Sequence, residues 1–248
     1  SRRGPGHLAT ERPLKNMSKI KEHRHQTYSE GKKSFLYKIF QRITLNARND
    51  FFNLFLINNG YSNNKTIIDI GTTPSLDKEQ NIFLENIKNN PNITCLSNQD
   101  CTILQEKYKN IKNILVGDGR DTKIDDNSFD IVHSNATIEH IGSFKNQISF
   151  VREMLRISKE SVFIQTPNRF YPIDFHTILP IIHWLPKSIH RKILKYLKLD
   201  FYSKEENLNL LSLRDIKSIC KILNIKKYKI LKYKLFFLTS NLILIIYK

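Results

Sequence analysis

The sequence predicts an α/β fold in which a seven-stranded, mostly parallel sheet carries helices on both faces and ends in an antiparallel hairpin. Apolar, β-branched segments alternate with segments of helical spacing between residues 66 and 166, which is typical of parallel strands joined by helices. The last two strand-like segments follow each other with no helix between them, which predicts the hairpin. A length of 248 residues with 40% hydrophobic content suits one sizeable domain with additions.

The chain before this sheet divides into two predicted parts. Residues 1–16 hold two of the eight glycines and two of the eight prolines, and Met17 follows at once. We interpret residues 1–16 as an appended leader, with a natural disordered arm as the alternative. Residues 17–60 are expected to form N-terminal helices, because Ser34–Leu45 and Ala47–Asn58 are amphipathic. The main domain is predicted over residues 61–248, with a helical insert at about 168–211.

The elements of the main domain are justified by their patterns, in order along the chain. Five apolar segments bounded by turn residues predict the parallel strands: Thr66–Gly71, Asn92–Ser97, Asn113–Gly117, Phe129–Ser134 and Glu160–Thr166. Helical spacing predicts the helices between them: Leu76–Asn90, Thr102–Tyr108 and a helix capped by Ser143 that runs to about Ser158. A capping-box pattern at Ser212–Asp215 opens a last helix to about Leu223. The hairpin strands are Lys229–Phe237 and Asn241–Tyr247.

The charge distribution and the cysteines limit the class of protein. The formal net charge is +17, yet residues 51–185 carry 13 Lys/Arg against 15 Asp/Glu, whereas residues 186–248 carry 15 against 4. Such basic flanks suit an acidic substrate, an anionic membrane or nucleic acid, unless they are only solvated surface. Cys95, Cys101 and Cys220 form no CxxC pair, and no apolar run is long enough to span a bilayer. We therefore expect reduced thiols in a cytoplasmic protein.

Two strand ends carry the residues with chemical potential. Asp69 and Gly71 end the first strand, and Asp118 and Gly119 end the third. In open α/β sheets, ligands bind beyond the carboxyl ends of the strands. A glycine there lets backbone amides approach a ligand, while a carboxylate accepts from an ammonium or an exocyclic amine. Each motif alone is also an ordinary turn, but the pair indicates a nucleotide-like ligand.

The ordered motifs resemble class I S-adenosylmethionine-dependent methyltransferases (EC 2.1.1.-), and most closely the methyltransferase type 11 branch. The resemblance covers about residues 48–248. It is carried by Asp69-Ile-Gly71, Gly117-Asp118-Gly119-Arg120, Ser128–His140, Thr166-Pro-Asn168-Arg169 and the segment Phe175–Pro186. It implies the Rossmann-like class I sheet described above and S-adenosyl-L-methionine as the cofactor.

The resemblance also implies roles for single residues. Asp69, Gly71 and Thr72 would border the methionine part of the cofactor, and Asp118, Gly119 and Arg120 the adenine. Ser134 and Asn135 would lie beneath the sulfonium. The chain departs from the family at Thr73-Pro74, where more glycine is usual, and after the second strand, where Ser97 and Asn98 replace the acid that holds the ribose. Asn98 is our candidate for that contact, without charge assistance.

Methyl transfer to an alcohol also needs a base, and three histidines are candidates. We rank His176 first, because Asp174 and Arg169 are near in sequence and could orient it or a substrate; His140 and His183 are the others. Each could instead cap a helix or fill a polar corner. The substrate-binding candidates are Glu139, Asn168, Arg169, Tyr171 and Trp184. The sequence indicates no metal site.

The last distinctive segment is the basic amphipathic helix Lys187–Leu199. It is either a core-packing helix with a solvated basic face or a lid that meets an anionic lipid-linked or phosphorylated acceptor at the inner face of the membrane. The leading expectation is methyl transfer to an O or N atom of a small-molecule or saccharide-type acceptor. RNA methylation is less favoured, because the charge lies outside the motif region. A non-catalytic cofactor-binding homologue is the third alternative.

Overall fold

The computed structural model describes residues 35–248, and the predictions for residues 1–16 and for Met17 lie outside them. The chain divides into two compact units at Asn49/Asp50, and the sheet belongs to the second, residues 50–248. Their helices are α3 (Ile82–Asn86), α4 (Leu104–Lys107), α5 (Phe144–Ile157), α6 (Lys187–Tyr196) and α7 (Leu213–Ile222). Two short 3-10 helices, η2 (Ile138–His140) and η3 (Ile182–Trp184), follow β4 and precede α6.

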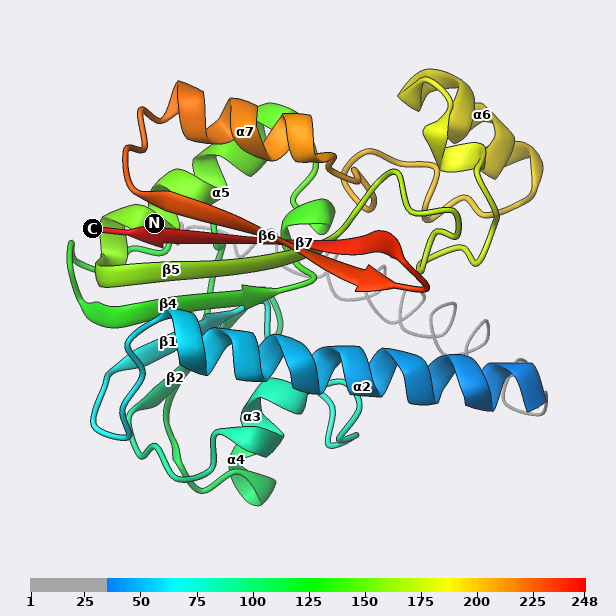
Figure 1. Ribbon diagram of the computed structural model, residues 1–248. Helices are drawn as coiled ribbons and strands as arrows, with labels where there is room; N and C mark the ends of the chain where they lie inside the picture. The colour runs from blue at the N-terminus through cyan, green and yellow to red at the C-terminus, as the bar shows by residue number, and fades with distance from the viewer. Residues whose placement is uncertain (1–34) are drawn as a thin grey trace, which may run out of the picture. The chain divides into compact units, whose positions relative to one another are not determined.

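One seven-stranded sheet has the order β3-β2-β1-β4-β5-β7-β6 (Figure 1). The strands are β1 (Ile67–Ile70), β2 (Ile93–Ser97), β3 (Ile111–Val116), β4 (Phe129–Asn135), β5 (Ser158–Pro167), β6 (Tyr228–Leu235) and β7 (Leu238–Tyr247). Strands β1 to β5 are parallel, whereas β7 runs antiparallel to both β5 and β6. The predicted fold class and the terminal hairpin are confirmed.

Strand β1 lies at the centre of the parallel part, and its four residues are all buried. Alternation along the strand sends Ile68 and Ile70 into the main apolar core, which α5 and α7 cover. Asp69 points to the opposite face, on which α3 and α4 lie (Figure 1). A polar side chain therefore occupies a strand that is apolar on its other face.

The two long helices of the core begin where their capping residues predict. The Ser143 side chain accepts from the Asn146 backbone N–H at the start of α5. Ser212 and Asp215 form a complete capping box at the start of α7, each side chain bonding the other residue's backbone N–H. Both helices present an apolar stripe to the sheet, and Phe150 of α5 is fully buried.

Two helix predictions were wrong in extent. Ser34–Leu45 and Ala47–Asn58 were expected as two helices, but Phe35–Asn58 is one uninterrupted helix, α2. The helix expected over Leu76–Asn90 is confined to α3. Before α3, side chains bond nearby backbone groups instead: Ser75 Oγ accepts from the Asp77 N–H, and Asp77 Oδ1 from the Glu79 N–H. Such local bonds compete with helical ones.

The insert leaves the sheet and returns to it at one point. Asn168 and Leu211 form a parallel bridge, and the Arg169 N–H donates to the Leu211 carbonyl at 2.9 Å. Between these ends the insert carries η3 and α6, and it lies at the carboxyl end of β5 (Figure 1). The predicted insert of about 168–211 therefore has these two residues at its neck.

Candidate functional site

The loop after β1 crosses the carboxyl edge of the sheet at Gly71, which is exposed. Gly71 has a φ of +96°, and a Cβ on it would lie 2.1 Å from Thr137 Oγ1, so only glycine fits here. Further along, the Asn81 amide donates to the carbonyls of Thr73 and Ser75 at 2.9 and 2.7 Å. These two hydrogen bonds hold the loop at Thr73-Pro74, where the family usually has a glycine-rich turn.

The Asp69 carboxylate is held from within the protein. Its Oδ1 lies 2.6 Å from His133 Nδ1, and its Oδ2 accepts from Thr72 Oγ1 at 2.9 Å. The His133 ring stacks on Phe83 at 3.8 Å between ring centroids, and Asp69 itself is 7% exposed. The hydrogen bond between Asp69 and Thr72 therefore stabilises the loop after β1. The contact of both residues with the methionine part of the cofactor stays a prediction.

His133 was missed by the sequence reading, although a signal for it existed. It is directly paired with Asp69 in the β1–β4 register, and alternation along β4 places it on the same face of the sheet. A histidine in a buried strand beside a strand that carries an acid is the pattern that would have found it.

The end of β3 presents a rigid acid. Asp118 accepts from the Arg120 backbone N–H at 2.8 Å and from its guanidinium, and this bonding holds the pKa of Asp118 below its usual range. The Asp118 side chain remains 45% exposed. A Cβ on Gly119 would meet Phe150 at 2.7 Å and Ile70 at 2.9 Å, whereas one on Gly117 would meet nothing within 4 Å. Gly119 is thus required by packing against α5.

The ends of β2 and β4 complete this edge. Asn98, our candidate for the ribose, is exposed next to the buried Ser97. Ser134 is fully buried and donates from Oγ to the Ile70 carbonyl. Asn135 Oδ1 is buried and finds no hydrogen-bond partner among residues 42–248. A buried acceptor with no partner at a strand end is a fitting position for a ligand, since such groups are normally bonded.

An acid–histidine cluster, made of Glu139, His140, Asp174 and His176, lies at the carboxyl ends of β4 and β5. His176 Nδ1 is 3.1 Å from Asp174 Oδ1, and its Nε2 is 3.7 Å from Glu139 Oε1. The His140 and His176 rings meet edge to face at 4.9 Å between centroids. The structure therefore brings together two of the three predicted bases.

The pKa values of the two carboxyl groups in the acid–histidine cluster are shifted in opposite directions. Glu139 is fully buried; burial raises its pKa, against the opposing effect of His176. Its Oε2 accepts from Thr166 Oγ1 at 2.9 Å, while Oε1 has no hydrogen-bond partner among the described side chains. Burial would raise the pKa of Asp174 as well, but hydrogen bonds from His176 and Thr177 outweigh it and hold that pKa well below its usual range.

The same cluster has a geometry that suits a metal ion. One ligand atom from each of Glu139, His140 and His176 lies within 4.8 Å of the others. His140 Nδ1 lies 2.6 Å from the Asn207 carbonyl and His176 Nδ1 faces Asp174, an arrangement that also orients metal-bound histidines. The sequence did not predict this set as metal ligands, because Glu139 and His176 are far apart in the chain.

His183 and Arg169 lie apart from His176. His183 is 1% exposed, and its Nε2 contacts the Tyr171 carbonyl at 2.7 Å. Arg169 donates to the carbonyls of His183 and Leu185. Asp174 is bonded to His176 as expected. The Arg169 guanidinium bonds the insert backbone, and its predicted role toward a substrate stays a prediction. Trp184, 44% exposed, also donates to the Tyr171 carbonyl.

Arg169 belongs to a basic cluster inside the insert, together with Lys187, His190 and Arg191. Burial and mutual repulsion lower the pKa values of Arg169, Lys187 and His190. Lys187 reaches Asn209 Oδ1 at 2.5 Å, and the backbone N–H of Asn209 donates to the Glu139 carbonyl. His190 Nε2 is buried with no hydrogen-bond partner among the described residues. Asn209 therefore links the basic cluster to the acid–histidine cluster, since it is bonded to Lys187 on one side and to Glu139 on the other.

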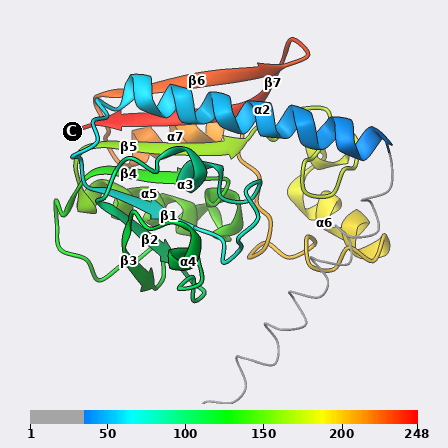
Figure 2. The ribbon, with the colours of Figure 1, turned by 90° about the horizontal axis from the view of Figure 1, so that it is seen from below.

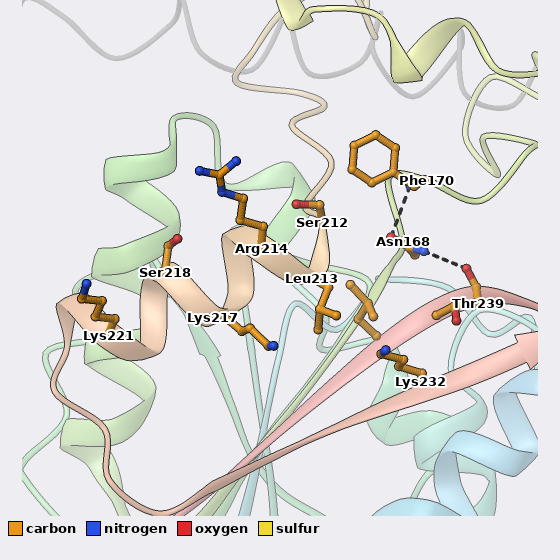
Figure 3. A pocket seen from close by; sticks show the side chains of 11 residues that line it. Asn168, Phe170, Ser212, Leu213, Arg214, Lys217, Ser218, Lys221, Lys232 and Thr239 are labelled. Carbon is orange, nitrogen blue, oxygen red and sulfur yellow. Dashed lines mark hydrogen bonds between the residues drawn. The ribbon is translucent and has the colours of Figure 1, made fainter.

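A separate groove of about 600 Å³ runs between α7 and the β6–β7 hairpin (Figure 3). Asn168 lies at one end of it and donates to the Thr239 carbonyl at 2.8 Å, so this candidate secures the hairpin to the end of β5. The groove is lined mainly by apolar atoms, and basic side chains stand around it: Arg214, Lys217, Lys221 and Lys232.

The comparisons with known proteins bear on the same edge of the sheet. Residues 86–164 match the family model described as a methyltransferase domain. The seven-stranded sheet, with its antiparallel terminal hairpin and helices on both faces, is the fold of class I S-adenosylmethionine-dependent methyltransferases. The matched residues include β2 to β4 and most of β5 and therefore hold Asp118, Asn135 and Glu139. The chain matches no curated protein.

Solved structures resemble the fold of this chain at low sequence identity. A SAM-dependent methyltransferase from Archaeoglobus fulgidus is 14% identical with a TM-score of 0.52, covering 87% of this chain and all of that one. The YcgJ protein from Bacillus subtilis is 14% identical with a TM-score of 0.50, covering 75% and 73%. A Rhodobacter sphaeroides structure named for zinc-dependent alcohol dehydrogenases reaches 0.55 at 11% identity, covering 79% and 88%. The family match and the fold together support S-adenosylmethionine as the cofactor.

Proposed function

We propose that this methyltransferase-fold protein transfers a methyl group from S-adenosylmethionine to an oxygen or nitrogen atom of a small-molecule or saccharide-type acceptor that carries negative charge. The observation that carries the proposal is His176, which Asp174 orients at the carboxyl ends of β4 and β5 beside a buried glutamate. In open α/β sheets this edge is where ligands bind.

Residues on three strand ends are suited to hold the cofactor. Exposed Gly71 leaves its backbone accessible, Asp118 offers an exposed carboxylate, and Asn135 offers a buried acceptor that protein groups leave unused. When bound, the cofactor supplies a methyl group already activated by the sulfonium. The protein then has to align the acceptor and receive its proton.

His176 is suited to receive that proton. With Nδ1–H donated to Asp174, the ring presents Nε2 towards Glu139 and His140. A proton taken on Nε2 gives an imidazolium that lies between two carboxyl groups and is stabilised by Asp174, which stays ionised because its pKa is depressed. General-base catalysis of this kind contributes about 10²- to 10⁴-fold to a rate.

The basic cluster supports an anionic acceptor. Arg169, Lys187 and Arg191 concentrate positive charge next to Asn209, and only Arg191 among them forms an ion pair, with Glu205, within the described residues. Burial is the main cause that lowers the pKa values of Arg169 and Lys187, and a phosphate or carboxylate on the acceptor would stabilise the charged forms of both side chains.

Replacement of His176 tests the proposal. His176→Ala is expected to bind S-adenosylmethionine normally in calorimetric titration and to lose about 100-fold or more of its turnover on phosphorylated or lipid-linked saccharides, with partial rescue by added imidazole. His183→Ala, the matched histidine of the same insert, is expected to retain turnover if it folds. Full turnover by His176→Ala would contradict the assignment.

Two observations keep the alternatives testable. Asn98 stands where an acid is usual, and Asp69 is bonded internally, which favours weak cofactor binding in a non-catalytic homologue. If calorimetric titration detects no affinity for S-adenosylmethionine or its demethylated product, the protein is such a non-catalytic homologue. RNA methylation instead requires salt-dependent RNA binding, which a filter-binding series measures directly.

A further inference from the structure

The β6–β7 hairpin closes on an unusual turn. Leu235 pairs with Leu238, so Phe236 and Phe237 are the two residues of the turn. Both have positive φ angles, 49° and 68°. Two-residue turns of this kind favour Asn-Gly, because glycine and asparagine adopt left-handed backbone angles at little cost. Two bulky aromatic residues at positive φ are therefore strained, and such strain is a reason to look for a function.

The two phenylalanines gain no burial that would offset this strain. Phe236 is 71% exposed, Phe237 is 95% exposed, and the adjoining Leu238 is 52% exposed. Neither phenylalanine takes part in a ring contact among the described aromatic residues. A tip of three large apolar side chains without internal packing is typical of a surface that meets another apolar phase.

Positive charge lies directly behind this tip. Lys232 and Lys234 of β6 are exposed, and no ion pair formed by the described residues involves them. Further from the tip, the groove of Figure 3 adds Arg214 and Lys217 of α7 around an apolar lining that Leu242 of β7 helps to form, with Lys221 at the far end of the helix. Apolar side chains at a tip with cations behind them complement an anionic lipid surface, where acyl chains lie beyond charged headgroups.

The tip also faces the right way for the acceptor. Asn241 pairs with Pro167 at the end of β5, so Phe236 and Phe237 project beyond the edge of the sheet where Thr166 contacts Glu139. Figures 1 and 2 both show the hairpin tip at the same end of the sheet as the insert that carries α6. A membrane that holds the tip would therefore lie on the acceptor side.

We propose that Phe236 and Phe237 insert into the interfacial layer of an anionic phospholipid bilayer, while Lys232 and Lys234 contact its headgroups. The inference rests on the proposed function for its purpose, which is to bring the site to an acceptor held at the membrane. The membrane contact of this protein is thereby assigned to the hairpin tip, with helix α6 outside the anchor. None of the helices in residues 35–248 is long and apolar enough to cross a membrane.

The test is flotation of the full chain with vesicles of phosphatidylcholine alone or mixed with phosphatidylglycerol. Phe236→Asn combined with Phe237→Gly is the key variant, because Asn-Gly suits the turn and leaves the fold intact. We expect the wild type to float only with the anionic vesicles, and the Asn-Gly variant to lose at least about tenfold in partitioning. Lys232→Gln with Lys234→Gln is expected to weaken binding and its salt dependence. Lys192→Gln with Lys195→Gln on α6 is the matched control, expected to float like the wild type.

Three results would overturn the inference: no flotation of the wild type, flotation of the Asn-Gly variant equal to wild type, or loss of flotation only in the α6 control. Self-association that the Asn-Gly variant abolishes in lipid-free sedimentation would likewise reassign the tip to a protein interface. Turnover on a soluble acceptor is measured in parallel. If it persists while flotation fails, the lipid contact alone is wrong; if flotation succeeds without turnover, the proposed function is wrong and the lipid contact stands.

Discussion

Gly71→Ala tests the geometry of the loop after β1 most directly. At a φ of +96°, an alanine adopts a backbone conformation that costs about 1–3 kcal/mol. Its Cβ would also lie 2.1 Å from Thr137 Oγ1 and 2.8 Å from Thr137 Cβ, so the loop after β4 has to move as well. We expect the free energy of unfolding to fall by about 2–3 kcal/mol and the affinity for S-adenosylmethionine to fall at least about tenfold.

Gly117→Ala is the matched control, since a Cβ there meets nothing within 4 Å and Gly117 has no positive φ. It is expected to change stability by less than about 0.5 kcal/mol. Urea unfolding and calorimetric titration of both variants give the two quantities. The reasoning fails if Gly71→Ala unfolds and binds like the wild type, or if Gly117→Ala is the more damaged of the pair.

Three further predictions concern charge, metal and capping. Because burial raises the pKa of Glu139, its charged form costs stability that increases as pH rises above about 4, the ordinary glutamate range. Glu139→Gln should therefore be more stable than wild type in urea unfolding at pH 7, with the difference vanishing below that range; an unchanged difference would contradict the assigned cause. Turnover should survive dialysis against a chelator, whereas a loss that one equivalent of a divalent cation restores would make Glu139, His140 and His176 metal ligands. Ser212→Ala removes one half of a capping box and should cost about 1 kcal/mol of unfolding free energy, whereas no measurable cost would place the stability of α7 in its packing alone.

Most of the sheet could be predicted because burial leaves a clear pattern in short strands. The four residues of β1 are all buried, and the three isoleucines among them identified the strand. The cap of α5 was equally predictable, since Ser143 acts on its own neighbour Asn146. The helix predicted over Leu76–Asn90 is shorter in the structure, because side chains such as Ser75 and Asp77 bond nearby backbone N–H groups. Hydrophobic periodicity does not reveal this competition.

The candidate site was predictable only where its contacts are local in sequence. Asp174 and His176 are two residues apart, and their pairing was anticipated. Glu139 reaches His176 only because β4 and β5 are neighbours and the insert folds back over their ends, which single-residue patterns do not reveal. The Asp69–His133 pair depends on the register between two strands in the same way.

The neck of the insert has an evolutionary consequence. Asn168 and Leu211 lie side by side, so a segment of any length could begin at one and end at the other without disturbing the strands. The residues proposed to hold the cofactor lie at the ends of β1, β3 and β4, whereas His176 and the basic cluster lie within the segment between Asn168 and Leu211. Under the proposed function, acceptor preference can therefore diversify by replacement of this segment. A chimaera that carries a foreign segment between these two residues is expected to keep its affinity for S-adenosylmethionine and to change its acceptor.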